Sequence, residues 1–117
     1  MALYHQLSVY VTTQRLLVEV VRASHQANRE YRYTIFQDLK RTLTQLLVQI
    51  YRINRNRDKA QWIDQARELV VEAGIYLHLL VELKAITAKQ YAQLLDMLDS
   101  SGRQLAAWER SANKLQR

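Results

Sequence analysis

Side chains able to carry out acid–base, nucleophilic or metal chemistry are few and widely separated in this sequence. The histidines are His5, His25 and His78. No two of them are close enough in sequence to share a helical turn, so we predict no metal site. The acidic pairs Glu68/Glu72 and Asp96/Asp99 have the spacing of solvated helical neighbours. Cysteine is absent, and the sequence has no phosphate-binding glycine loop or nucleophile elbow. We therefore predict a protein that is not an enzyme, with no catalytic residue, no metal and no cofactor.

Positive charge is concentrated between residues 22 and 59. This segment holds nine basic and three acidic residues, which accounts for the whole net charge of +6. Such asymmetry is typical of a surface that binds nucleic-acid phosphates, and the alternative is a solvated face that favours solubility. The predicted nucleic-acid contacts are Arg29, Arg32, Lys40, Arg41, Arg52, Arg55, Arg57 and Lys59.

Tyrosine offers a second route to nucleic acid, because an exposed ring can stack on an unpaired base. The candidates are Tyr31, Tyr33, Tyr51, Tyr76 and Tyr91. Aromatic side chains at helical spacing are nevertheless expected first of all in the core.

Four amphipathic segments must position these residues. The expected helices cover residues 5–27, 31–54, 59–83 and 87–114. In the second, apolar residues recur every three or four positions from 36 to 53, which places Arg41, Arg52 and Arg55 in one stripe on the opposite side. Asp58 is expected to cap the third helix, and Thr87 with Gln90 forms a capping box at the fourth.

The fold class follows from these helices. The chain has 117 residues, no proline and two glycines, which argues against a turn-rich β domain. Short connections between long helices predict an all-α, up-down-up-down four-helix bundle that forms a single domain over residues 1–117. Gly102 is expected to permit a close helix approach. No apolar run approaches the roughly 20 residues of a membrane span, and the signal-peptide layout is absent. We therefore expect a soluble cytoplasmic protein with no membrane partner.

Apolar residues exceed what one core-facing stripe requires. Residues 69–81 contain few polar side chains, and residues 16–21 are apolar on nearly every side. This surplus predicts a homo-oligomer that uses the first helix, the third helix or both. The predicted interface residues are Leu16, Val20, Val71, Ile75, His78 and Leu79. The alternative is a wider core with a different helical register.

Three short segments occur in an order found in a known family. They are Arg32-Tyr33-Thr34, residues 82–91, and residues 101–108 with the pattern Gly102-Arg103-x-Leu105-x-x-Trp108. Together they resemble the accessory variability determinant (Avd) proteins of diversity-generating retroelements, over about residues 4 to 112. A related bundle family, encoded within intervening sequences of large-subunit ribosomal RNA genes, has a similar outline but matches poorly at residues 50–55.

The resemblance implies a basic four-helix bundle that assembles as a pentamer and has no catalytic activity of its own. It further implies association with a reverse transcriptase and with template RNA or cDNA, in support of adenine-directed mutagenic retrohoming. Two positions that are commonly arginine in the family align with Gly74 and His78, so basic contacts are expected on the second helix and its flanking loops. A second hypothesis is a pure protein–protein interaction module in which the charge only steers association.

Overall fold

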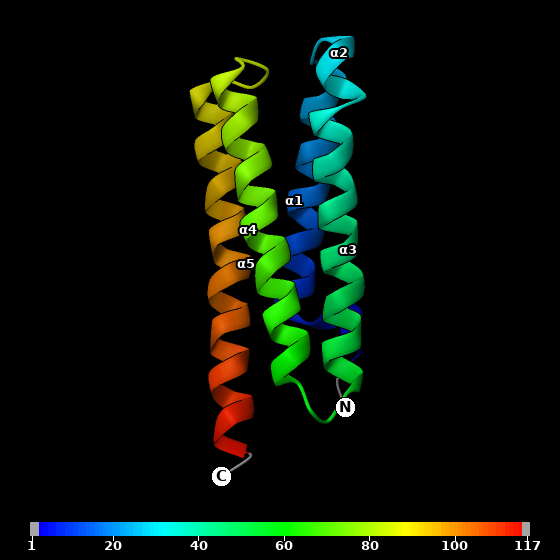
Figure 1. Cartoon of the computed structure of the whole chain (residues 1–117), viewed down its shortest axis with the longest axis vertical. Helices are drawn as coiled ribbons and strands as arrows, with labels where there is room; N and C mark the ends of the chain where they lie inside the picture. Colours follow the sequence, from blue (N-terminus) through cyan, green and yellow to red (C-terminus); the bar gives the residue numbers. More distant parts are fainter. Residues whose placement is uncertain (1–2, 116–117) are drawn as a thin grey trace.

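Four long helices alternate in direction along one rod-shaped bundle (Figure 1). The computed structural model describes residues 3–115 and measures 50 × 20 × 19 Å along its principal axes. The elements are η1 (Tyr4–Gln6), α1 (Ser8–His25), α2 (Arg29–Arg32), α3 (Ile35–Arg55), α4 (Ala60–Glu82) and α5 (Ala88–Leu115). The all-α, up-down-up-down bundle expected from the sequence is confirmed.

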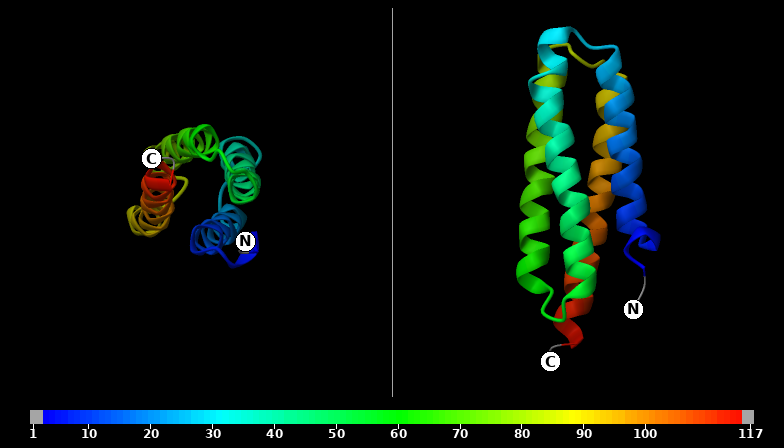
Figure 2. Two further views of the ribbon diagram at one scale, coloured as in Figure 1. Left: turned by 90° about the horizontal axis from the view of Figure 1, so that it is seen from below. Right: turned by 90° about the vertical axis from the view of Figure 1, so that its right-hand side faces the viewer.

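The long helices lie around a square when viewed along the bundle (Figure 2). α1 packs against α3 and α5, and α4 packs against the same two helices. α1 and α4 therefore occupy opposite corners, and their outer sides face in opposite directions. The end of the bundle at which α1 begins, α5 ends and the α3–α4 turn lies is called the lower end here, as it is drawn in Figure 1.

The core is built from the apolar stripes of the four helices. Its largest fully buried side chains include Phe36, Leu43, Ile63, Leu77 and Leu105, with at least one from each of α3, α4 and α5. Burial of these stripes is the main stabilising contribution for helices of this kind. No buried side-chain nitrogen or oxygen of the described residues lacks a hydrogen-bond partner.

Two polar contacts cross between helices inside this apolar core. The Thr13 and Ser101 hydroxyl oxygens lie 2.9 Å apart and join α1 to α5. The Gln49 side-chain amide donates to the Trp62 backbone carbonyl at 3.0 Å and to Gln65 Oε1 at 3.1 Å, joining α3 to α4. Satisfied buried polar groups of this kind favour one helix register over others.

Helix boundaries depart from the sequence-based expectation at two places. The first expected helix begins instead as η1, and the extended residue Leu7 separates it from α1. The second expected helix is broken at Tyr33 and Thr34, because Thr34 has non-helical backbone angles of φ −121° and ψ −95°. Its hydroxyl donates to the Glu30 carbonyl at 2.6 Å, which closes the last turn of α2.

The predicted helix caps have opposite outcomes. At α5 the capping box is confirmed, since the Gln90 N–H donates to Thr87 Oγ1 at 3.0 Å and the Thr87 N–H donates to Gln90 Oε1 at 2.8 Å. The expected Asp58 cap of α4 is wrong, because the residue at the N-cap is Lys59 and it makes no side-chain capping bond.

The α4–α5 turn places a lysine in the left-handed region. Lys84 has φ 59°, and its N–H donates to the Val81 carbonyl at 3.0 Å. The Ala85 N–H donates to the Leu80 carbonyl at 2.9 Å. These two bonds form a Schellman motif, in which glycine is the usual residue at the Lys84 position.

Two further expectations concern Gly102 and the membrane. A Cβ atom at Gly102 would lie 3.6 Å from Val70 Cγ1, an ordinary van der Waals distance, so the expected close helix approach does not require this glycine. Over residues 3–115, no helix is both long and apolar enough to cross a bilayer.

Candidate functional site

The predicted basic residues separate into two groups at opposite ends of the bundle. Arg29, Arg32, Lys40 and Arg41 lie toward the upper end, and Arg52, Arg55, Arg57 and Lys59 lie at the lower end. Arg41 and Arg52 are exposed on one side of α3, yet they are about 16 Å apart along the helix axis. Uncharged side chains, among them Thr44 and Val48, fill the interval. One continuous basic stripe is therefore absent from the described part of α3.

Arg32 closes the end of α1 rather than facing solvent. Its Nε donates to the Ser24 carbonyl at 3.1 Å, and its Nη2 donates to the carbonyls of His25 at 2.8 Å and Ala27 at 3.2 Å. Carbonyls in the last turn of a helix have no partner within the helix, and a cation suits the negative end of the helix dipole. Arg32 therefore has a helix-capping role in the fold, and its contact with phosphate stays a prediction.

Lys59 has the corresponding role at the end of α3. Its Nζ donates to the carbonyls of Ile53 and Asn56, each at 2.7 Å, and to that of Asn54 at 3.4 Å. The same ammonium group lies 5.7 Å from the centre of the Trp108 ring, a cation–π contact. Burial lowers the pKa of Lys59 below its ordinary value. All three donors act within the chain, so Lys59 caps α3, and its contact with phosphate stays a prediction.

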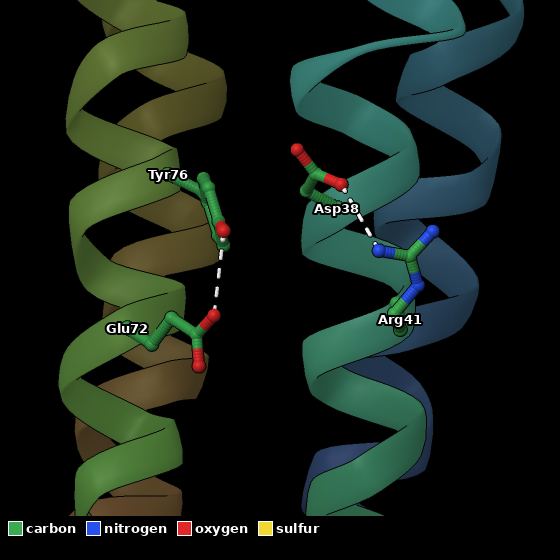
Figure 3. Close-up of polar contacts among 4 residues, drawn as sticks. All are labelled: Asp38, Arg41, Glu72 and Tyr76. Carbon is green, nitrogen blue, oxygen red and sulfur yellow. Dashed lines mark hydrogen bonds and ion pairs between the residues drawn. The ribbon is translucent and has the colours of Figure 1, made fainter.

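Arg41 lies on α3 beside Asp38, and Glu72 and Tyr76 of α4 lie across from this pair (Figure 3). Its Nη1 is 3.4 Å from Asp38 Oδ1, and on the facing side of α4 the Tyr76 hydroxyl donates to Glu72 Oε1 at 3.3 Å. Burial raises the pKa of Tyr76, and the Glu72 and Asp38 carboxylates add to this rise while Arg41 opposes it. The Arg41 charge therefore offsets local acids, which weakens it as a phosphate contact.

Arg52, Arg55 and Arg57 form the lower arginine cluster. All three are exposed, and none is ion-paired with an acid among the described residues. Arg52 Nη1 lies 3.5 Å from Gln49 Oε1, and Arg55 Nη1 donates to the Tyr51 hydroxyl at 3.0 Å. Their full positive charge is thus available at the lower end of the bundle, where a polyanion could reach it.

An apolar stripe runs along the outer side of α4. Val71, Ile75 and Leu79 follow one another at single-turn spacing, and Leu83 continues the line. The exposed fractions are 64% for Val71 and 55% for Ile75, which is high for large aliphatic side chains. These four residues are called the α4 stripe. Carboxylates adjoin it, including Glu82, which lies 3.5 Å from His78 Nε2.

The predicted interface residues divide between this stripe and the core. Val71, Ile75, His78 and Leu79 are exposed, so a partner could contact them. Leu16 and Val20 have no exposed surface, because their side of α1 faces the bundle core. The prediction of an interface at Leu16 and Val20 is therefore wrong. Residue types alone could not show which side of this nearly uniform apolar segment faces inward.

An aromatic group at the lower end was missed by sequence reasoning. The Tyr4 ring packs edge-on against Tyr10 and against Tyr51, with centroid separations of 5.3 and 5.1 Å. Tyr51 was a candidate for base stacking, but η1 brings Tyr4 to it from far away in the sequence, and Tyr10 of α1 packs on the same Tyr4 ring. The three tyrosines have no spacing signal that would have grouped them.

No cluster of three or more metal-ligating side chains occurs in the part of the chain that the structure describes. No protein-family model matches the sequence, and no curated protein matches it. The lower arginine cluster and the α4 stripe are therefore the two surfaces from which a function can be inferred.

Proposed function

We propose that the protein is a non-enzymatic, self-associating adaptor that binds nucleic acid and a protein partner. The observation that carries this proposal is the separation of charge and apolar surface. Arg52, Arg55 and Arg57 gather at one end of the bundle, whereas the α4 stripe lies along one side and is flanked by acids. Separate surfaces allow nucleic acid and protein to be bound at the same time.

Phosphate contacts are assigned to the lower arginine cluster, with Arg29 and Lys40 as weaker contributors near the other end. Rigid helices without a base-reading motif contact the sugar–phosphate backbone of a nucleic acid, so binding is expected to tolerate many nucleotide sequences. The α4 stripe is assigned to self-association, because aliphatic side chains this exposed are costly to leave in water.

The resemblance to Avd proteins gives this adaptor a specific setting. In that setting it assembles as a pentamer in the cytoplasm and joins a reverse transcriptase to its template RNA or cDNA during mutagenic retrohoming. A reverse-transcriptase gene with paired template and variable repeats beside the coding gene would support the assignment. A neighbourhood without these elements would contradict it.

A pure protein–protein interaction module is the second candidate. The observation in its favour is the internal use of cationic side chains. Arg32 and Lys59 cap helices, and Arg41 pairs with Asp38, so fewer charges remain for phosphate than the sequence indicated. A monomer that has no affinity for RNA at low salt would favour this module over the adaptor.

The salt dependence of RNA binding tests the arginine assignment. The variant Arg52→Gln/Arg55→Gln/Arg57→Gln is compared with Arg22→Gln/Lys84→Gln/Lys89→Gln, which removes the same charge from the opposite end of the bundle. Each lost phosphate contact lowers the slope of log affinity against log salt by about one unit, so the first triple variant should lose two to three units, roughly. The second should change the slope far less. Equal losses in both variants would show that general charge, and not this cluster, binds the RNA.

A further inference from the structure

A hollow lined by tyrosine rings opens at the lower end, between η1, α1 and α3. It measures about 560 Å³, within the range of small-molecule sites. Tyr4, Tyr10 and Tyr51 line it together with the aliphatic side chains of Leu47 and Val48. Tyr4 and Tyr51 are each 38% exposed, so ring surface remains open to a ligand. This hollow is called the tyrosine pocket.

A second hollow lies beside it at the α3–α4 turn. It measures about 390 Å³ and is lined by Arg55, Arg57 and Lys59, with Trp108 at its wall. No acidic side chain is among its lining residues, although Asp58 belongs to the same loop. The ammonium group of Lys59 donates its hydrogen bonds to carbonyls at the end of α3, but its charge still adds to the positive potential of the hollow. This hollow is called the arginine pocket.

Arg55 connects the two pockets. Its guanidinium carbon lies 5.5 Å from the centre of the Tyr51 ring, and its Nη1 donates to the Tyr51 hydroxyl at 3.0 Å. The side chain of Arg55 therefore lines the arginine pocket while it rests on a wall of the tyrosine pocket. An aromatic surface and an uncompensated cation lie within one side-chain length of each other.

A nucleotide joins the two chemistries that this arrangement offers, a flat aromatic base and an anionic phosphate. We propose that the lower end binds an unpaired nucleotide, with its base against the tyrosine rings and its phosphate at Arg55 and Arg57. This inference rests on the proposed nucleic-acid function and makes it specific for single strands. A base inside a duplex is stacked on both faces and cannot enter the pocket, whereas an unpaired base can. RNA and single-stranded DNA share the recognised chemistry.

The α4 stripe of a second copy is the competing occupant, because it is apolar and flanked by acids. The pocket pair favours a nucleotide because three aromatic rings meet a cation at one point, an arrangement suited to stacking and cation–π contact. The stripe is an extended helix side of about 12 Å from Val71 to Leu79, and it supplies no planar group for the rings. Strand binding and native mass of the tyrosine variants distinguish the two occupants.

Binding is measured with a mixed-sequence RNA strand of about ten nucleotides, with the same sequence as DNA, and with the corresponding blunt RNA duplex. Tyr51→Leu removes a stacking ring and keeps an apolar side chain. Tyr51→Phe keeps the ring and loses only the hydroxyl bond to Arg55. Tyr33→Leu is the matched control, since Tyr33 is 63% exposed at the upper end and lines neither pocket. Tyr4→Leu repeats the test at a second wall of the pocket.

We expect Tyr51→Leu and Tyr4→Leu to weaken single-strand binding by about five- to tenfold, the lower part of the range for loss of one stacked base. RNA and DNA strands should both respond, and duplex binding should change by less than about twofold. Tyr51→Phe and Tyr33→Leu should bind single strands as the unaltered protein does. Circular dichroism checks that every variant keeps its helices.

Two results would overturn the nucleotide pocket while the adaptor function stands. One is salt-dependent RNA binding that Tyr51→Leu and Tyr4→Leu leave unchanged, or weaken equally for strand and duplex. The other is loss of the assembly in Tyr51→Leu, as measured by native mass, which would identify the pocket as an interface between copies. If no strand binds the unaltered protein at low salt, the proposed function itself fails.

Discussion

The hydroxyl oxygens of Thr13 and Ser101 lie 2.9 Å apart in the bundle interior, where neither residue has exposed surface. Thr13 Oγ1 also donates to the Val9 carbonyl at 2.8 Å. Each hydroxyl has one proton, so Ser101 must be the donor to Thr13. Ser101 is therefore the donor and Thr13 the acceptor of this hydrogen bond. Thr13 has a second partner, the Val9 carbonyl, whereas Ser101 bonds only to Thr13 in this pair.

This direction predicts unequal effects of the two substitutions. Thr13→Val leaves the Ser101 hydroxyl buried without its acceptor, which should lower the free energy of unfolding by about 1–3 kcal/mol. Ser101→Ala leaves the Thr13 bond to Val9 intact and should cost about 0.5–1.5 kcal/mol. In the double variant the two costs should not add, and urea unfolding of all four proteins measures the coupling. Additive costs would contradict the coupling, and a larger cost for Ser101→Ala than for Thr13→Val would contradict the assignment of donor and acceptor.

Lys84 is a residue whose replacement is expected to stabilise the protein. A non-glycine residue in the left-handed region costs the folded chain about 1–2 kcal/mol. Glycine removes this cost, but it also raises the conformational entropy of the unfolded chain, which offsets part of the gain. Lys84→Gly should therefore raise the free energy of unfolding by about 0.5–1 kcal/mol. Ala92→Gly, at an exposed position inside α5, should lower it by a similar amount. A destabilised Lys84→Gly protein would show that the Lys84 side chain makes a compensating contact.

The cap formed by Arg32 predicts a loss of stability when this side chain is replaced. Arg32→Met removes three hydrogen bonds to the carbonyls of α1 and of the turn that follows it, and should cost about 1.5–3 kcal/mol in urea unfolding. Arg29→Met is the control, because Arg29 is exposed and its variant should stay within about 0.5 kcal/mol. Equal stability of the two variants would contradict the capping role of Arg32.

Tyr76 predicts a pH dependence at alkaline pH. Its pKa is raised above 10.0 in the folded chain, mainly by burial and then by Glu72, so the unfolded chain loses this proton first. The stabilising contribution is complete below pH 10.0 and is lost as the pH rises through the higher folded value. Tyr76→Phe should lose less stability over this interval than the unaltered protein.

Glu72→Gln tests the cause of that shift. It removes the carboxylate that accepts the Tyr76 hydrogen bond, so the phenol should ionise at a lower pH than before, as followed by phenolate absorbance. Glu82→Gln, also on α4 but not among the groups that shift Tyr76, is the control. A phenolate titration that Glu72→Gln does not alter would leave burial and the Asp38 carboxylate as the causes of the raised pKa.

The α4 stripe predicts an assembly that charge can dissociate. Val71→Asp/Ile75→Asp places two charges on the proposed interface, and native mass and light scattering should then report single chains. Both side chains are exposed, so the helix content should not change. Tyr33→Asp adds a charge at an equally exposed apolar site at the upper end and should leave the assembly intact. An assembly that persists in the double variant would place the interface elsewhere.

Local patterns were sufficient for the helices and for some of the site. The apolar spacing of α3 and the Thr87–Gln90 capping box depend on residues a few positions apart, and both are confirmed. The exposed position of Val71 and Ile75 also follows from helical periodicity. Leu16 could not be placed, because the α1 segment around it is apolar on nearly every side.

Contacts made across turns were beyond sequence reasoning. Arg32 and Lys59 have the same residue types as phosphate-binding cations, and only the path of the chain shows that helix ends lie within their reach. The meeting of Tyr4 with Tyr51 depends on η1 folding back toward the lower end of α3. In both cases the decisive geometry joins segments whose spacing carries no periodic signal.

The square arrangement of helices has a consequence for chain order. The first and last long helices are neighbours, and α1 begins at the same end of the rod at which α5 ends (Figure 1). A flexible linker from the end of α5 to η1 would therefore close the bundle into a covalent circle, and a new opening in the α1–α2 turn would give a circular permutant with every neighbouring pair preserved. Such a permutant would carry its free ends far from the tyrosine and arginine pockets, which makes it a suitable form for attaching fluorescent or affinity labels.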